Sequence, residues 1–401
     1  MQPYSIAHNR VRAIFFLHGA AFSSWVPHIP LVQERLGLGH DALGGILLAA
    51  AIGVLAVMPI AGRLADRFGS ERVVRYSGLF YFIAVGIPAF MPSYFSISIA
   101  MFALGFSGAF LDVSMNANGL HVERVKGRSI MSGLHGFWSL GGFAGAGIAA
   151  AWFALPISNN YHLPFVLTLF LIAHIIAQAG LLTDQAAARA IGREGKTKIN
   201  ETQSGSAKIK ERHMFLVLLP FGVCAFIGQF GEGVITDWAT VFLNSELSSG
   251  PTMAAVGFAI YSFAMAATRL SGDALVTRFG RVNVLLTSSV LASLGTFIIT
   301  FAPHYMVAWI GCGVAGMGLA VILPLLLSAA SKATGKGGGS VVSTIAATGY
   351  SAIMAGPPVI GAIGEAAGLV TAFAFTATFL GMIIPVYLLT MRGRLQIAGN
   401  G

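Results

Sequence analysis

The sequence predicts an all-α polytopic membrane protein whose twelve transmembrane helices form two six-helix bundles. Three observations predict this class. First, 56% of the 401 residues are apolar and only 10% are charged, whereas a soluble domain carries about 25% charged residues. Second, the charges fall in short runs between apolar stretches of roughly 20 residues, which is the length a helix needs to cross hydrocarbon. Third, a short sequence motif in the first half of the chain recurs at the corresponding place in the second half.

Each predicted span is an apolar stretch bounded by a polar, glycine or proline break. The first six spans cover residues 12–33, 41–62, 73–91, 95–118, 129–153 and 163–183. The second six cover residues 214–243, 252–273, 282–302, 305–330, 339–364 and 369–391. Arg10 and Arg12 lead into the first apolar stretch, which has no A-x-A cleavage site, so this span is expected to act as its own insertion signal.

A polar segment divides the chain into two predicted domains. Residues 184–212 are rich in Lys, Arg, Ser and Gly and predict a cytoplasmic linker. Residues 1–183 then form the N-terminal six-helix bundle, and residues 213–401 form the C-terminal six-helix bundle. An even number of spans places both chain termini on the same side of the membrane.

The basic residues predict which side this is. If both termini are cytoplasmic, all of the 24 Lys and Arg residues except Arg35 lie on the inner side. This asymmetry follows the positive-inside rule. The net charge of +9 is therefore assigned to orientation and to contact with anionic lipid, and nucleic-acid binding is not predicted. The expected location is a bacterial inner membrane.

The two halves share a short motif. The segment "AGRLADRFGSERVV" (61–74) follows the second span, and "SGDALVTRFGRVNVL" (271–285) follows the eighth. Both contain Gly, then Asp, then Arg-Phe-Gly at the same place within a six-span half. Repeats related by an axis along the membrane normal are typical of transporters whose site lies between the halves, near the midplane.

Twelve spans with this loop between the second and third resemble the major facilitator superfamily over essentially the whole chain. The resemblance implies that Asp66, Arg67 and Arg72 latch helices near the inner face during conformational switching. Ser70 and Glu71 depart from the family pattern, which often has two basic residues there. The residues assigned to a gate or switch are Gly62, Asp66, Arg67, Gly69, Arg72, Asp237, Arg269, Asp273 and Arg278.

Three further segments resemble the MosC-like branch, which includes the YbjJ-type proteins, within this superfamily. They are "GAFLDVSMNANGLHVE" (108–123), "SIMSGLHGFWSLGG" (129–142) and "GEGVITDWATVFL" (231–243). The branch is connected by name with rhizopines, which are inositol-derived amines. The fourth span lacks the arginine of many proton-coupled drug transporters, and the fifth lacks the proline of the drug/proton antiporter signature. Both absences weigh against multidrug export.

Charged side chains inside a bilayer are costly, so they usually face a cavity or a partner and mark an ion or solute path. Asp112 lies about eight residues from the inner end of its span, which is ~12 Å deep at 1.5 Å per residue. His135 and His18 lie at a similar depth in the same half. These three residues predict a proton-sensitive cluster. The alternative is that Asp112 only accepts hydrogen bonds between helices.

Two more acids occupy the seventh span. Glu232 and Asp237 are five residues apart, so they cannot share one face of an unbroken helix. Gly231 and Gly233 are expected to let the helix kink or unwind. Glu232 is predicted to face the cavity and bind solute or a proton, whereas Asp237 is predicted to fix the outer gate or cap the broken helix. Helix packing is the alternative for both.

Aromatic and amide residues near these depths are candidates for lining the site, although Trp and Tyr also anchor helices at membrane interfaces. The candidate solute-binding residues are Trp25, Asn116, Trp138, Gln229, Glu232, Trp238, Tyr261 and Tyr350. Arg269 lies near Asp273, one helical turn away, which predicts a gate ion pair. No role is assigned to Glu365. Small residues in 141–150 and 356–368 are expected to let helix backbones approach and slide.

Several functions are not predicted. The segment "GKGGGS" (335–340) lacks the G-x-x-x-x-G-K-[ST] spacing of a nucleotide-binding loop. Cys224 and Cys312 lie in separate apolar stretches and are expected to be core residues. No nucleophile–base pair or metal-ligand spacing indicates an enzyme, and no cofactor or metal is predicted.

The sequence therefore predicts a secondary active transporter of a small polar solute, similar to a sugar, an inositol or an amine. Coupling to protons through Asp112 and Glu232 is expected, and sodium is disfavoured because the acids are scattered. Two alternatives remain open, namely an exporter of amphipathic compounds by proton antiport and a membrane sensor that binds solute without moving it. The expected partners are the solute, protons and the bilayer, and the family resemblance implies a monomer.

Overall fold

The computed structural model describes residues 3–127, 130–187, 189, 211–334 and 339–391, without the side chains of some residues inside these ranges. The first half contains α1 (Pro3–Trp25), η1 (Val26–His28), α2 (Ile29–Leu36), α3 (His40–Phe68), α4 (Ser70–Gly86), η2 (Ile87–Phe90), α5 (Tyr94–Lys126), α6 (Met131–Phe153), η3 (Asn159–Tyr161) and α7 (His162–Gln178). The second half contains α9 (Glu211–Ser245), α10 (Gly250–Phe279), α11 (Arg281–Thr300), α12 (Tyr305–Leu319), α13 (Ile322–Thr334), α14 (Gly339–Ala367), α15 (Leu369–Gly381), α16 (Ile383–Val386) and η5 (Tyr387–Met391). Residues 188 and 190–210 of the predicted linker lie outside the described residues.

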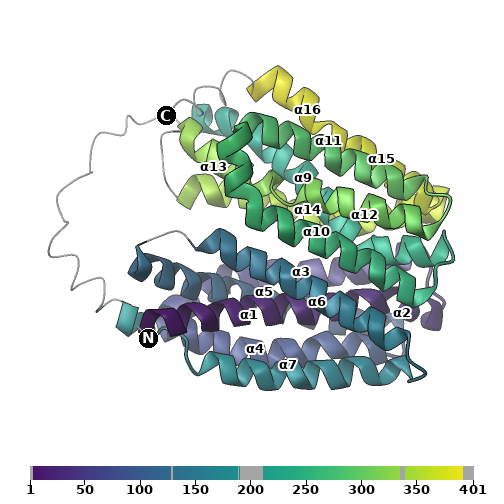
Figure 1. Cartoon of the computed structure of the whole chain (residues 1–401), viewed down its shortest axis with the longest axis horizontal. Helices are drawn as coiled ribbons and strands as arrows, with labels where there is room; N and C mark the ends of the chain where they lie inside the picture. The colour runs from purple at the N-terminus through teal and green to yellow at the C-terminus, as the bar shows by residue number, and fades with distance from the viewer. Residues whose placement is uncertain (1–2, 128–129, 188, 190–210, 335–338, 392–401) are drawn as a thin grey trace.

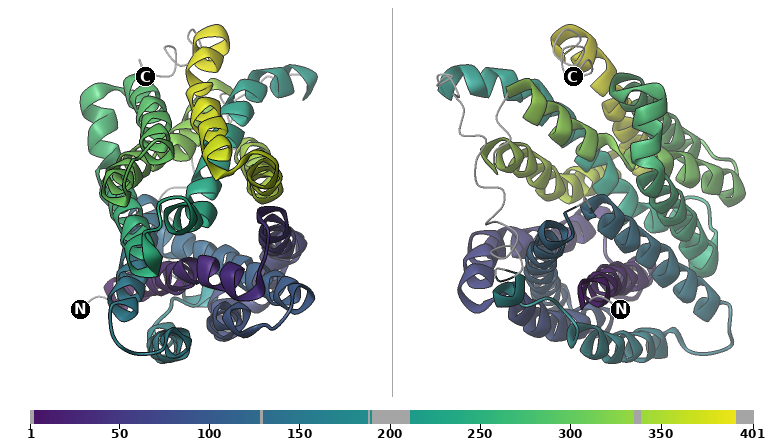
Figure 2. Two further views of the ribbon diagram at one scale, coloured as in Figure 1. Left: turned by 90° about the vertical axis from the view of Figure 1, so that its right-hand side faces the viewer. Right: turned by 60° about the vertical axis from the view of Figure 1, so that its left-hand side comes forward.

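The elements form two bundles that lie side by side (Figure 1). Helices α1 to α7 make up the lower bundle in that view, and helices α9 to α16 make up the upper one. Figure 2 shows the same separation from two other directions. The twelve-helix, two-bundle fold predicted from the sequence is confirmed. Four predicted spans are each divided between consecutive elements: α1, η1 and α2; α4 and η2; α12 and α13; and α15, α16 and η5.

The breaks have local causes. Pro27 and Pro30 lie where α1 gives way to η1 and α2, and proline cannot donate a backbone hydrogen bond to the preceding turn. Similarly, Pro324 follows the break between α12 and α13. These prolines bend the helices within the spans.

The shared Arg-Phe-Gly motif builds the same turn in each bundle. Gly69 joins α3 to α4 with φ 92°, and Gly280 joins α10 to α11 with φ 80°. This left-handed region favours glycine because a Cβ atom is strained there. The guanidinium of Arg67 lies 5.3 Å from the ring of Phe68, and the second motif repeats this contact at 5.2 Å. The motif therefore specifies two sharp turns at one end of the molecule, which we call the basic end.

The most extensive contacts between the bundles are those of α6 with α10 and of α3 with α14, and smaller ones join α2 and η1 to α9. Glycines permit the close approach of α3 and α14. A Cβ atom added at Gly44 would lie 2.6 Å from the carbonyl oxygen of Pro357, and one at Gly361 would lie 2.6 Å from that of His40. Both contacts are shorter than packed atoms allow, so each position requires a residue without a side chain.

The end opposite the turns at Gly69 and Gly280, which we call the far end, is bridged between the bundles. The backbone N–H of His40 in α3 donates to Glu365 Oε2 of α14 over 2.8 Å. The side chains of these residues form an ion pair at 3.8 Å when the histidine is protonated. The hydroxyl of Thr240 in α9 donates to the carbonyl oxygen of Val26 in η1 over 3.4 Å. Glu365, which had no predicted role, therefore belongs to the far-end closure.

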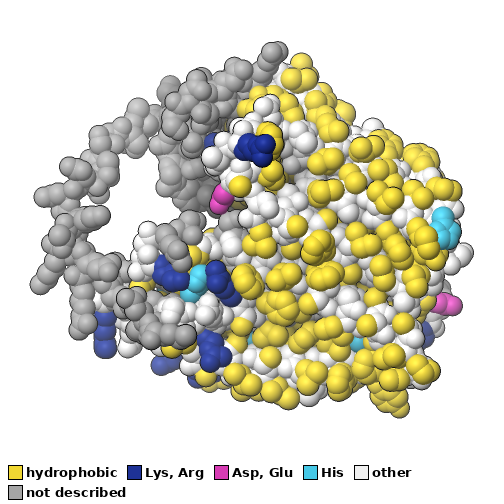
Figure 3. All heavy atoms as spheres, in the orientation of Figure 1, with side chains coloured by type: hydrophobic (Ala, Val, Ile, Leu, Met, Phe, Trp, Pro, Cys, Tyr) yellow, Lys and Arg dark blue, Asp and Glu magenta, His cyan; other side chains and the backbone are white. Residues whose placement is uncertain are grey.

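The surface agrees with a membrane protein. Hydrophobic side chains cover much of the face in Figure 3, and Lys and Arg lie toward the basic end, on the left. In the described part of the chain, nine helices are long and apolar enough to cross a bilayer. Arg63, Arg67, Arg72 and Arg75 are all exposed near the turn at Gly69.

Candidate functional site

His18 of α1 is the centre of a polar cluster inside the N-terminal bundle. Its Nδ1 atom accepts a hydrogen bond from Trp138 Nε1 over 2.9 Å. Its ring lies 4.6 Å from that of Tyr81, whose hydroxyl donates to the His18 carbonyl oxygen over 3.0 Å. An indole N–H can only donate, so Nδ1 of His18 carries no proton in this arrangement. The ring is therefore held as a neutral imidazole.

Asp112 of α5 borders this cluster. Its Oδ1 atom accepts from Asn116 Nδ2 over 3.1 Å, and the same amide donates to the Asp112 carbonyl oxygen over 2.8 Å. The carboxyl group of Asp112 lies within electrostatic reach of Tyr81, and the ring of His135 lies within electrostatic reach of His18. The predicted trio of Asp112, His18 and His135 thus shares one neighbourhood, although within the described residues no hydrogen bond joins Asp112 to either histidine.

His135 lies on α6 and is the exposed member of the group. Its ring packs edge to face with that of Phe15, with the centroids 5.4 Å apart. The carbonyl oxygen of His135 accepts from the hydroxyl of Ser139, one turn later, over 3.3 Å. His135 also lies within electrostatic reach of Arg269 from the other bundle, so it connects the N-terminal cluster with a second group of polar residues.

Arg269 of α10 is the centre of this second group and uses three of its nitrogens. Nη2 donates to Glu232 Oε1 of α9 over 3.0 Å and forms an ion pair with it. Nη1 donates to Ser139 Oγ over 2.8 Å. Nε donates to the carbonyl oxygen of Ala320 over 3.2 Å. One guanidinium therefore joins α10 to α9, to the break between α12 and α13, and to the opposite bundle.

The Ala320 carbonyl is available because of Pro324. In a regular helix this carbonyl would accept from the N–H four residues later, but proline has no N–H. Arg269 supplies the missing donor. Neither Ser139 nor this carbonyl is among the residues predicted from the sequence, and Pro324 is the signal that could have revealed the carbonyl.

Within the described residues, the predicted gate pair of Arg269 and Asp273 is not formed in this conformation. Arg269 reaches across to Glu232 instead, while Asp273 is exposed on α10. A spacing of four residues permits contact along a helix, but it does not decide which partner a long side chain takes in the folded protein. Glu232 is therefore paired with a cation, and its side chain is still 20% exposed.

The expected unwinding of the seventh span is wrong. Helix α9 continues through Gly231 and Gly233 to Ser245. Gly231 instead provides room for Leu380, whose Cδ2 would lie 2.5 Å from an added Cβ atom. Asp237 is partly buried eight residues before the end of α9, so it cannot cap a broken helix. Its assignment to the outer gate stays a prediction.

The predicted lining residues with described side chains form a buried group and a half-buried group. Trp25, Trp238 and Tyr261 are buried, with 3%, 0% and 2% of their surfaces exposed. In this conformation their side chains are not open to a solute, and their assignment to solute binding stays a prediction. The half-buried candidates are Asn116, Trp138, Gln229 and Glu232. The side chain of Tyr350 lies outside the described residues.

The predicted latch residues lie at the basic end. Asp66, Arg67, Arg72 and Arg278 are exposed, and Gly62 is half-buried. Within the described residues, the ion pairs are those of His40 with Glu365, His121 with Asp184 and Arg269 with Glu232, so the latch is not formed in this conformation. Asp184 instead accepts from the Ser70 backbone N–H over 3.0 Å and from its hydroxyl over 2.7 Å.

Comparisons with known proteins assign this arrangement to a family. The model of the Major Facilitator Superfamily matches residues 13–242 and 221–396. An uncharacterized MFS-type transporter of Yersinia pestis is 30% identical over 380 residues, covering 95% of this chain and 94% of the relative. The membrane protein MosC of Rhizobium meliloti is 26% identical over 373 residues, covering 92% and 86% of the two chains.

A solved structure shares the fold. The crystal structure of a D-xylose–proton symporter superposes with a TM-score of 0.74, covering 96% of this chain and 97% of the symporter, at 13% sequence identity. The relatives confirm the predicted MosC-like branch. The chain is a multi-pass membrane protein that belongs to the major facilitator superfamily of transporters.

Proposed function

We propose that this protein is a secondary active transporter that moves a small polar solute by alternating access and couples the movement to protons. The observation that carries the proposal is the contact of Arg269 with both Glu232 and Ser139. A single cation links an acid of the C-terminal bundle to a hydroxyl of the N-terminal bundle. Because Arg269 contacts both bundles, the charge of Glu232 can influence the strength of the contact between them.

The coupling follows from the cost of charge in a low-dielectric region. The ionised Glu232 neutralises Arg269, whose side chain is 15% exposed. When Glu232 takes up a proton, the cation loses its counter-charge and must find water or another acceptor. Arg269 then leaves Ser139, which weakens the contact between α6 and α10. The ionised and protonated forms of Glu232 therefore favour different arrangements of the bundles.

Asp112 and His135 extend the proton path into the N-terminal bundle. His135 is exposed and lies within reach of the Arg269 charge, so it can exchange protons with water. His18 is less suited to this role, because uptake of a proton at Nδ1 would break its hydrogen bond from Trp138. We therefore assign proton transfer to Glu232, Asp112 and His135, and the positioning of Trp138 to His18.

The closed far end supports an inward-facing state. Bridges from His40 to Glu365 and from Thr240 to Val26 join the bundles there. If the basic end is cytoplasmic, as the distribution of Lys and Arg favours, solute reaches the site from the cytoplasm. Both chain termini are then cytoplasmic. Residues 1–183 and 213–401 would move as the two rocking units.

The half-buried side chains favour a small polar solute. Asn116 and Gln229 offer amide donors and acceptors, Trp138 offers an aromatic face, and Glu232 offers a negative charge. Such a set suits hydroxyl and amine groups, as in a sugar-like or inositol-like amine. An exporter of amphipathic compounds is the second candidate. A non-transporting sensor is the third, and it predicts solute binding without flux.

The test uses proteoliposomes that contain a trapped pH-sensitive dye. Polyols, amino sugars, amines, organic acids and amphipathic cations are added to wild type and to the Asp112→Asn and Glu232→Gln variants. The matched control is Glu246→Gln, because Glu246 is an exposed acid just beyond the end of α9. A solute that moves protons in wild type and in the control, but not in the two variants, supports the proposal.

Three results would reject parts of the proposal. Equal solute uptake without any proton movement would remove the coupling and leave a facilitator. Binding of a solute without flux in any preparation would favour the sensor. Proton movement with amphipathic cations alone would favour the exporter.

A further inference from the structure

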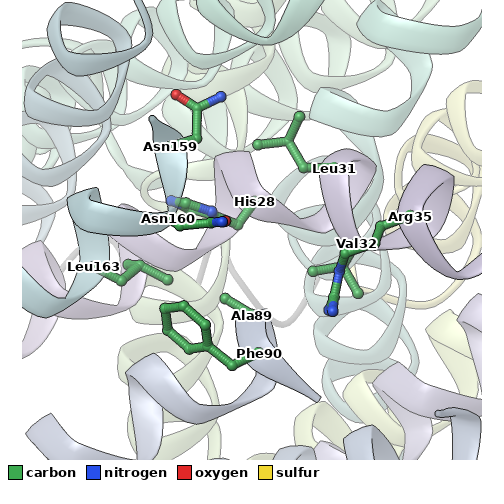
Figure 4. A pocket seen from close by; sticks show the side chains of 9 residues that line it. All are labelled: His28, Leu31, Val32, Arg35, Ala89, Phe90, Asn159, Asn160 and Leu163. Atoms are coloured by element: carbon green, nitrogen blue, oxygen red, sulfur yellow. The ribbon is translucent and has the colours of Figure 1, made fainter. Parts of the chain in front are cut away.

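A small cavity lies at the far end of the N-terminal bundle, apart from the site described above. Its volume is about 210 Å³, and residues of η1, α2, η2, η3 and the start of α7 line it (Figure 4). The lining residues are His28, Leu31, Val32, Arg35, Ala89, Phe90, Asn159, Asn160 and Leu163. Apolar side chains form much of the wall, and its polar groups come from His28, Arg35 and the two asparagines.

The charge on the lining of this cavity is positive and comes from Arg35. No Asp or Glu is among the residues that line it. Arg35 is exposed, and none of the three ion pairs in the described part of the chain includes it. In Figure 4, His28 and Asn160 lie next to each other, and Arg35 lies across from them beside Val32. The lining therefore presents a cation that has no carboxylate partner among the residues the structure describes.

The tautomer of His28 adds a donor to the lining. Nε2 of His28 and Nδ1 of His162 are 2.9 Å apart, so one of them donates to the other. Nε2 of His162 is buried and has no hydrogen-bond partner within the described residues. A buried N–H without an acceptor is rarer than an acceptor left without a donor. The favoured arrangement therefore has His162 Nδ1–H donating to His28, which leaves the proton of His28 on Nδ1.

We infer that this cavity binds a small oxyanion, namely a phosphate or carboxylate group. The Arg35 guanidinium, the His28 Nδ1–H and the Asn160 amide all donate hydrogen bonds, and donors that carry charge form the stronger bonds to anions. A volume of about 210 Å³ is below the range of pockets for drug-sized ligands, so it suits a single anionic group. The group belongs either to a free anion or to a lipid head group.

Because of where the cavity lies, a bound anion would affect the contact between the bundles at the far end. His28 ends η1, and Val26 at the start of η1 accepts the hydrogen bond from Thr240 that joins the bundles. An anion held by His28 and Arg35 ties η1 to α2 and stabilises the closed far end. Under the positive-inside arrangement, this site faces the outside of the cell.

The experiment measures binding of inorganic phosphate and of acetate to the purified full-length protein in detergent, by calorimetry at constant ionic strength. The variants are Arg35→Gln and Asn160→Leu. The matched control is Arg63→Gln, which removes an exposed arginine at the basic end. We expect at least one of the two anions to bind wild type and the control equally. Loss of Arg35 should weaken that binding at least about tenfold, a difference of 1.4 kcal/mol, and loss of Asn160 should weaken it less.

A second arm separates the two sources of the group. The protein is placed in nanodiscs of phosphatidylcholine with or without phosphatidylglycerol, and thermal unfolding is compared for wild type and Arg35→Gln. Stabilisation by phosphatidylglycerol that Arg35→Gln abolishes identifies a lipid head group. Binding of free phosphate or acetate without this stabilisation identifies a free anion. No binding in either arm, or binding that Arg35→Gln leaves unchanged, overturns the inference. Neither readout depends on transport, so failure here is separate from failure of the proposed function.

Discussion

At the scale of single residues, Arg269 shows how a membrane protein keeps a charge in its interior. Its guanidinium has a carboxylate, a hydroxyl and a backbone carbonyl as acceptors. Removing one partner from a buried ion pair costs about 3–5 kcal/mol, because the remaining charge is left unpaired. The three acceptors therefore make Arg269 tolerable in this position. They also make its state depend on the charge of Glu232.

This dependence predicts the result of a double-mutant cycle. Glu232→Gln and Arg269→Gln should each lower the free energy of unfolding by about 3 kcal/mol. The double variant should lose less than the sum of the two, with a coupling energy of about 1–3 kcal/mol. Denaturant titration in detergent measures all four proteins. Glu246→Gln is the control and should stay within about 0.5 kcal/mol of wild type. Strict additivity would show that the pair does not contribute to stability.

Contacts between side chains on different helices are the feature that the sequence predicts least well. Asp112 and Glu232 were singled out because acids are rare in apolar stretches. The partner of Glu232 was missed because contacts between helices depend on rotation about each helix axis, which spacing along one helix does not determine. Glu365 had no predicted role for the same reason, since its contact is His40, 325 positions away in the chain.

At the scale of helices, the contact between α3 and α14 is made possible by glycine on both sides. A Cβ atom at Gly361 would lie 2.6 Å from the His40 carbonyl oxygen and 3.1 Å from Gly44 Cα. These neighbours are backbone atoms, so they cannot rotate away. Closure of the far end therefore depends on residues that lack side chains, as the small-residue spacing of 356–368 predicted.

Gly361→Ala should accordingly open the far end. The added methyl group pushes α14 away from α3 and separates Glu365 from His40. Spin labels at Glu34 and Ala366, which are both exposed at this end, should report distances longer by a few ångströms. Gly147→Ala is the control, because no atom lies within 4 Å of its added Cβ. An unchanged distance distribution in Gly361→Ala would mean that the helices absorb the methyl group without separating.

The helices themselves were the most predictable level. Apolar length identified all twelve spans, and the Arg-Phe-Gly motif identified the repeat, which the structure realises as the turns at Gly69 and Gly280. The division of the first span also has a local cause, since Pro27 and Pro30 remove backbone donors. The continuity of α9 was not predictable in this way, because glycine permits a break without requiring one.

At the scale of the whole molecule, orientation is the property that fixes the direction of solute access. All Lys and Arg residues except Arg35 lie on one side of the predicted topology, and this asymmetry favours a cytoplasmic basic end. The two native cysteines, Cys224 and Cys312, are buried. A cysteine introduced at an exposed position is therefore expected to dominate labelling by a membrane-impermeant maleimide.

Ser158→Cys at the far end and Asn283→Cys at the basic end test the orientation, since both positions are exposed. In intact spheroplasts, Ser158→Cys should react, whereas Asn283→Cys should react only after permeabilisation. Wild type, with its buried thiols, controls for background labelling. The reverse pattern would place the basic end outside. The bridges from His40 to Glu365 and from Thr240 to Val26 would then close the cytoplasmic side, and the structure would represent the outward-facing state of the same cycle.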